Sequence, residues 1–227
     1  MPRQKQSRGQ CGYCGKDFAR GGMLKHLATC AERQTVIAAA SRTRRPVEKL
    51  AHLQVRDAFG GQYWLNLEVN GSATLKDLDY YLRGIWLECC GHMSQFSIGG
   101  WGGAEIPMKT RIGRIFLPEV ELTHIYDFGT ESVTLIKTAA VRDGQPLTKH
   151  PIALMARNAP PDFKCMECDQ PATQLCLECQ IEFDQPGWLC DEHAEEHPHD
   201  NYGEPMLIVN SPRIGLCGYS GPAEPPY

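Results

Sequence analysis

The chain has 227 residues, of which 42% are hydrophobic and 22% are charged, and its formal net charge is −4. No apolar run approaches the roughly 18 residues that a membrane span needs, and no apolar segment of the secretory kind follows the basic N-terminus. We therefore expect a globular cytoplasmic protein with no membrane partner. Its eleven cysteines should stay reduced, and their C-x2-C pairs favour metal binding over disulfides.

The charge is divided unevenly along the chain. Residues 1–50 hold 11 Lys and Arg against 3 Asp and Glu, a net +8, whereas the other 177 residues hold 12 against 24, a net −12. A basic N-terminal segment can contact phosphate groups or an acidic partner. Nucleic-acid binding through residues 1–50 is therefore one alternative for this region.

The first motif lies within residues 1–34, which we predict to form a C2HC zinc finger. Phe18 and Leu24 are expected to provide its small core. A C-x2-C turn presents two thiolates, and a His and a Cys four residues apart share one helical face, so the four can surround one zinc ion. The spacing C-x2-C-x11-H-x3-C resembles the C2HC zinc-finger family, with the candidate ligands Cys11, Cys14, His26 and Cys30.

The next two segments are a linker and a central domain. Residues 35–49 are Ala-rich and then basic, and we expect a short helix followed by a linker. Residues 50–158 are expected to form an α+β domain with a mixed sheet and one main helix. Thr74, with Asp77 three residues later, predicts the N-cap of that helix, and apolar residues recur at helical spacing up to Trp86.

Short apolar runs predict the strands of this central domain. One strand precedes the main helix and five follow it, and Gly129 is expected to join two of them in a hairpin. The predicted strands cover 63–69, 93–98, 111–116, 122–128, 132–141 and 151–156.

The segment HIYDFGTESVTLIK, from His124 to Lys137, resembles the signature of the plasmid Ri open-reading-frame-three family, the TnpR-like passenger proteins of insertion elements. Tyr126, Asp127, Phe128 and Gly129 match that signature. The resemblance implies a fold for residues 55–158 and a plasmid or mobile-element setting, but no reaction. Family members often carry Asp-x-Trp-x-His after the Gly, and this chain has Thr-Glu-Ser-Val-Thr there.

The same strand pair has two interpretations. In the structural interpretation, which we favour, Tyr126 and Phe128 bury on one strand face and Gly129 permits the turn. In the functional one, His124, Asp127 and Lys137 line a ligand groove.

Three other cysteines and one histidine are given structural roles. We interpret Cys89 and Cys90 as packed thiols rather than a redox site, and His92 as an isolated histidine. Cys217 is expected to be buried in the packing of a Gly/Pro-rich tail over 203–227, with a ligand role as the alternative.

A second metal region lies within 159–202, where 165–199 contain five Cys, three His and no Lys or Arg. The seven residues between the first two C-x2-C pairs are few for one zinc ribbon, so we predict two interleaved zinc sites. The arrangement resembles the B-box family. The first site would use Cys165, Cys168, Cys190 and His193, and the second Cys176, Cys179, His197 and His199. Asp200 could replace either histidine of the last pair.

The acidic residues of this region, Glu178 among them, are expected to face solvent. Because the region has no Lys or Arg, we expect the module to contact protein rather than nucleic acid.

Each predicted site has four protein ligands and no open position, which favours three structural Zn²⁺ ions over catalytic ones. We therefore expect a non-enzymatic zinc-binding adaptor of mobile-element or plasmid origin that mediates protein interactions. The alternative is a nucleic-acid-binding accessory that uses the basic N-terminal finger. An enzyme with a pocket beside Asp127 is a third alternative.

Overall fold

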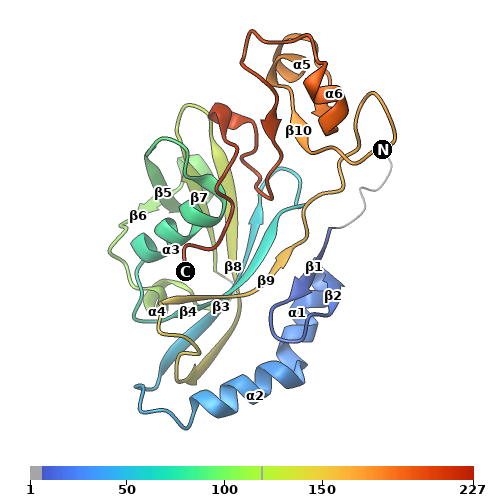
Figure 1. The fold of residues 1–227 in the computed structure, drawn as a ribbon. Coiled ribbons are helices and arrows are strands. Elements are labelled where there is room, and N and C mark those ends of the chain that lie inside the picture. The colour runs from blue at the N-terminus through green and yellow to red at the C-terminus, as the bar shows by residue number, and fades with distance from the viewer. Residues whose placement is uncertain (1–6, 119) are drawn as a thin grey trace.

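The computed structural model describes residues 7–118 and 120–227. Nine strands form one sheet in the order β2-β1-β9-β4-β3-β8-β7-β5-β6 (Figure 1). Every pairing between them is antiparallel, so the prediction of a mixed sheet is wrong. The strands are β1 (Arg8–Cys11), β2 (Asp17–Ala19), β3 (Glu48–Asp57), β4 (Trp64–Asn70), β5 (Ser94–Ile98), β6 (Ala104–Ile106), β7 (Glu121–Tyr126), β8 (Ser132–Gly144) and β9 (Ile152–Asn158).

The central strands β3 and β4 present two different faces. One face is apolar and forms the main core with the helix over 75–87; it carries Ala51, Leu53, Val55, Leu65, Leu67 and Val69. The opposite face carries Trp64, Asn66 and Glu68, which are all buried. Residues 51–56 of β3 alternate apolar and polar side chains, as a strand with one core face does, but this strand is missing from the predicted set.

The main helix begins as predicted. Thr74 and Asp77 form a reciprocal capping box at the start of α3 (Leu75–Leu82). The chain continues into a π-helical turn over Arg83–Leu87, where Ile85 and Trp86 are fully buried. Beyond β5, a 3-10 turn over Gly100–Gly102 leads to β6.

The segment 111–116 forms a short helix, α4 (Ile112–Ile115), so its prediction as a strand is wrong. Ile112 and Phe116, four residues apart, are both buried, which is a helical spacing. The amide of Ile112 donates to the carbonyl of Ala73 at 2.8 Å, and that of Gly113 donates to Gly71 at 3.0 Å. These contacts with the loop before α3 replace the ladder that a strand would need.

The N-terminal region extends the sheet. It contains α1 (Arg20–Thr29) and α2 (Ala31–Ala40), each longer than α3, so the fold has more than one main helix. Strand β1 pairs with β9, and α2 provides the short helix expected before the linker, although it begins earlier, at Ala31. Met23 and Leu27 form a buried core with Trp64 and Met155 of the sheet, whereas the predicted core residue Leu24 is only partly buried.

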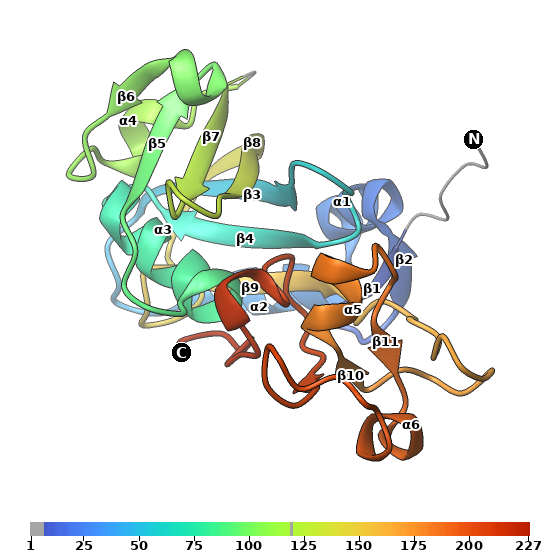
Figure 2. The same cartoon turned by 90° about the horizontal axis from the view of Figure 1, so that it is seen from above.

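The C-terminal region forms a small three-stranded sheet in the order β11-β10-β12 (Figure 2). Its elements are β10 (Gln174–Leu175), α5 (Leu177–Glu182), β11 (Trp188–Leu189), α6 (Asp191–Glu195) and β12 (Met206–Leu207). None of the described helices is both long and apolar enough to cross a membrane.

The predicted Gly/Pro-rich tail packs on the central domain. Strand β12 belongs to it, and the chain then returns to end beside α3 (Figure 1). The Ser211 hydroxyl donates to the carbonyl of Trp86 at 2.6 Å, and the Tyr227 ring stacks on His150 with centroids 4.2 Å apart. Tyr219 is 2% exposed. The tail is therefore an ordered part of the core rather than an appendage.

Candidate metal centres

The structure brings the four predicted residues of the N-terminal motif together. Their ligand atoms all lie within 4.8 Å of one another, and Cys14 Sγ is 3.2 Å from His26 Nε2. The turn after Cys11 is closed by hydrogen bonds from Gly15 and to Lys16, and the Gly12 amide donates to the carbonyl of Met155 on β9 at 2.8 Å. The cluster is thus attached directly to the main sheet.

The two predicted clusters of the C-terminal module also assemble, and they do so in the interleaved arrangement. Cys165, Cys168, Cys190 and His193 form one group, and Cys176, Cys179, His197 and His199 form the other. The first C-x2-C pair meets the third pair, and the second meets the fourth. No single group contains both C-x2-C pairs, as one zinc ribbon would require.

The distances between ligand atoms fit a tetrahedral zinc ion. Bonds of about 2.3 Å to sulfur and about 2.0 Å to nitrogen place two sulfur ligands about 3.8 Å apart, and a sulfur and a nitrogen about 3.5 Å apart. In the first group Cys168 Sγ lies 3.9 Å from Cys190 Sγ, and Cys165 Sγ lies 3.6 Å from His193 Nδ1. This cluster could therefore hold a metal ion with little rearrangement.

Both histidines of the last pair take part in the second group. Cys179 Sγ lies 3.2 Å from His197 Nε2 and 3.2 Å from His199 Nδ1. Asp200 does not belong to the cluster. Glu178 is buried, which corrects its expected solvent exposure: its carboxylate accepts hydrogen bonds from the backbone and side-chain amides of Asn201, at 3.0 and 2.7 Å. Glu178 thereby orients the loop that carries the last two ligands.

The ligands themselves make up most of the core of this module. Its buried cluster consists of four cysteines with Leu189 and Ala194. Strands of two residues and helices of five and six residues bury too little surface to be stable alone. Metal binding would therefore supply much of the free energy of folding of this region.

The three residues of the candidate ligand groove do not form one site. His124 is fully buried, and its Nε2 lies 2.8 Å from Asp79 Oδ1 on α3. Lys137 is exposed and pairs in register with Glu121, which places it on the opposite face of the sheet from His124. Phe128 is 41% exposed, so its predicted burial beside Tyr126 is wrong.

Asp127 has a structural partner that sequence reasoning missed. It adopts a left-handed backbone with φ 65°, which ends β7 and turns Phe128 outward. Burial raises the pKa of Asp127, but the Thr130 amide, the Arg213 guanidinium and the Gly129 amide outweigh this effect and bring the pKa to about 2. Arg213 comes from the tail and is fully buried.

The described residues contain a fourth Cys/His cluster, formed by Cys89, Cys90, His92 and Cys217. No spacing rule predicts it, because two of its cysteines are adjacent rather than arranged as C-x2-C. The third cysteine is 125 positions from His92. Only the docking of the tail brings them together.

No protein-family model and no curated protein matches this chain. A crystal structure of a protein of unknown function from Methanosarcina mazei aligns with a TM-score of 0.40 at 19% sequence identity. The alignment covers 46% of this chain and 66% of that one. A likeness of this size indicates neither a fold nor a function for this chain.

Proposed function

We propose that this chain is a non-enzymatic zinc-binding adaptor that mediates protein interactions. The observation that carries the proposal is the saturation of its metal clusters: each predicted cluster offers four protein ligands to one ion. A structural zinc is closed in this way, whereas a catalytic zinc keeps one position for water or substrate. The likeness of Tyr126–Gly129 to the plasmid open-reading-frame-three signature supports a plasmid or mobile-element origin.

Zinc is the metal that this ligand set favours. Thiolates and imidazoles in a tetrahedral arrangement suit Zn²⁺, while Mg²⁺ and Ca²⁺ prefer oxygen ligands. The three predicted clusters would hold one ion each. Two of them would support the C-terminal module, and the third would support the N-terminal finger.

The C-terminal module presents an apolar and acidic surface suited to a protein partner. Ile181 is 59% exposed and Phe183 51% exposed, with the exposed carboxylates of Glu182 and Asp184 beside them in sequence. The Phe183 ring stacks on the His199 ring with centroids 4.8 Å apart. A metal bound by His199 would therefore hold this surface in place, and a partner with apolar and basic groups would complement it.

Affinity capture with a matched control tests this proposal. We expect the full chain to capture a partner protein. When that purified partner is titrated, the variant Ile181→Ser/Phe183→Ser should bind it at least tenfold more weakly than the parent does. Val47→Ser, which alters a residue 64% exposed outside the module, should bind like the parent. Metal content should be equal in all three proteins. Equal binding by the parent and the double variant would contradict the assignment of this surface.

Nucleic-acid binding is the second candidate, and exposed basic side chains favour it. Lys16, Lys25, Arg42 and Arg44 are exposed, although Arg33 is buried against Glu68 and unavailable. This function predicts that affinity for a labelled DNA duplex or RNA strand falls steeply with salt. It also predicts that Lys16→Glu/Lys25→Glu weakens binding. Flat fluorescence-anisotropy isotherms at low salt would contradict it.

A further inference from the structure

Every cysteine of the chain lies in a Cys/His cluster. The chain has eleven cysteines, all of them free thiols in the described residues, and the three predicted clusters use eight. The other three, Cys89, Cys90 and Cys217, meet around His92. The four clusters therefore contain all eleven cysteines, of which the three predicted clusters contain eight.

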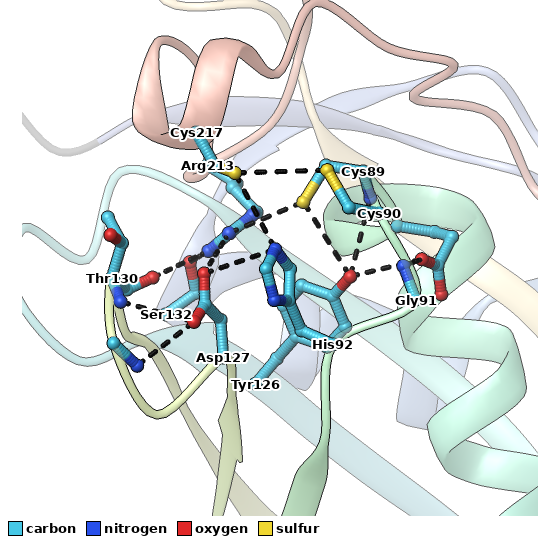
Figure 3. A network of polar contacts seen from close by, with 12 residues as sticks. Cys89, Cys90, Gly91, His92, Tyr126, Asp127, Thr130, Ser132, Arg213 and Cys217 are labelled. Carbon is cyan, nitrogen blue, oxygen red and sulfur yellow. Dashed lines mark hydrogen bonds and ion pairs between the residues drawn. The ribbon is translucent and has the colours of Figure 1, made fainter.

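Two segments of the chain meet at this point, residues 89–92 and the part of the tail that carries Cys217 (Figure 3). Cys89 and Cys90 follow the π-helical turn that ends at Leu87, and Gly91 turns the chain with φ 75°. His92 then comes just before β5. Cys217 arrives from a 3-10 turn of the tail over Leu216–Gly218.

The distances match those of the other clusters. Cys90 Sγ lies 3.8 Å from Cys217 Sγ, and Cys217 Sγ lies 3.5 Å from His92 Nε2. All four ligand atoms lie within 4.8 Å of one another. A tetrahedral zinc requires about 3.8 Å between two sulfur ligands and about 3.5 Å between sulfur and nitrogen. A disulfide would need its sulfur atoms about 2.05 Å apart.

The surrounding charges also suit a metal–thiolate centre. Three thiolates bound to Zn²⁺ leave one net negative charge. The buried guanidinium of Arg213 lies 3.4 Å from Cys89 Sγ, so it can donate a hydrogen bond to a thiolate at that position. Asp127 Oδ2 is 3.5 Å from His92 Nε2, but it is held by Arg213 at 2.6 Å. The protein therefore supplies three sulfur ligands and one nitrogen ligand beside a buried hydrogen-bond donor.

We propose that Cys89, Cys90, His92 and Cys217 form a fourth zinc site, which fastens the C-terminal tail to the central domain. Cys90 and Cys217 are exposed, whereas at least two ligands of every other cluster are buried. This zinc is therefore the one most accessible to a chelator. The site does not depend on the adaptor function, because it follows from the cluster alone.

Metal analysis of the full chain, purified under reducing conditions with zinc, tests the proposal. We expect four zinc ions per chain, and three in both His92→Gln and Cys217→Ser. Met93→Gln is the matched control, since Met93 is adjacent, 70% exposed and outside the cluster, and it should keep four. Three ions in the parent, or four in both ligand variants, would overturn the proposal.

Thiol labelling of the parent provides a second measurement that does not depend on how the variants fold. Cys90 and Cys217 should resist alkylation while zinc is bound, despite their exposure. After a short treatment with chelator, the alkylating reagent should label Cys89, Cys90 and Cys217 before any other cysteine. Prompt labelling of Cys217 without chelator, or a Cys90–Cys217 disulfide in the reduced preparation, would overturn the site.

Discussion

Arg213 and Asp127 form an ion pair that joins the C-terminal tail to the turn between β7 and β8. Arg213 Nη2 lies 2.6 Å from Asp127 Oδ2, and the arginine side chain is fully buried. Its Nη1 donates to the Thr130 carbonyl at 2.8 Å and to the Ser132 hydroxyl at 3.0 Å. A signature that reads as a simple hairpin from sequence is therefore also the docking site of a segment more than 80 residues away.

Arg213→Met should destabilise the protein strongly. Removing one partner of a buried pair leaves the other charge uncompensated, which costs about 3–5 kcal/mol. We expect a loss of this order in urea unfolding at saturating zinc, together with faster proteolysis of the tail. Arg44→Met, at an exposed arginine, should change stability by less than about 0.5 kcal/mol. Equal midpoints for the two variants would contradict the structural role of the pair.

The interleaved arrangement of the C-terminal clusters can be tested by metal counting. Cys165→Ser/Cys168→Ser and Cys176→Ser/Cys179→Ser should each remove one zinc, and the fourfold variant should remove two, because the pairs belong to different ions. If both pairs shared one ion, the fourfold variant would lose no more zinc than either double variant. Elemental analysis of the three proteins distinguishes these outcomes.

Two glycines of the C-terminal region form a matched test of backbone crowding. Gly187 and Gly203 both have positive φ, of 70° and 84°. A Cβ at Gly187 would lie 2.4 Å from the Cys176 carbonyl oxygen, whereas a Cβ at Gly203 would meet nothing within 4 Å. Gly187→Ala should therefore weaken zinc binding at the Cys176 cluster, measured by competition with a chromogenic chelator. Gly203→Ala should lower the free energy of unfolding only by the cost of placing alanine in a left-handed backbone conformation, about 1–2 kcal/mol.

Glu68 links the N-terminal helices to the sheet. Its buried carboxylate accepts from Arg33 on α2 at 3.1 Å and from Arg142 on β8 at 2.7 Å. Glu68→Gln removes the charge that both arginines share, so α2 should open more readily. We expect its amides to exchange with deuterium at least about tenfold faster, which corresponds to about 1.4 kcal/mol. Glu32→Gln, at an exposed position of α2, should leave exchange unchanged.

His52 should stay neutral in mildly acidic solution. Burial lowers its pKa to about 4, although the hydrogen bond with Asn66 partly opposes the shift. In the unfolded chain the pKa is about 6.5. Because the folded pKa is the lower one, the unfolded state takes up the proton first, and this contribution to stability is lost as pH falls from about 6.5 toward 4.

NMR of the histidine rings measures this directly. At pH 5.5 we expect His52 to be only about 3% protonated, against about 90% for a histidine with an ordinary pKa. His52→Gln should make stability less dependent on pH between 7 and 5.5, where the parent loses stability. A His52 ring that titrates near pH 6.5 in the folded protein would show that the site is hydrated.

The ligands of the three predicted clusters could be found from sequence because they are local. A C-x2-C turn followed by a His–Cys pair one helical turn apart is typical of a zinc site and rarely arises by chance. The interleaved order followed from the short connection between Cys168 and Cys176. Fixed spacing of reactive side chains is thus a strong signal even in a single sequence.

The missed features depend on contacts between distant segments. The helix α4 is too short for its helical spacing to stand out, and it is fixed by contacts with the loop before α3. The fourth cluster needs Cys217 to meet Cys90, 127 positions away. Arg213 gives no local sign that it is buried, because arginine is usually exposed and its burial depends on partners far along the chain.

The pairing of β1 with β9 affects how this protein can be divided for experiments. A fragment that starts at β3 would remove the strand that covers β9 and leave its hydrogen-bonding groups open to solvent. An uncovered strand of this kind recruits other chains. Such a shortened protein would be expected to self-associate, so expression of the central region alone would report on aggregation rather than on its native behaviour.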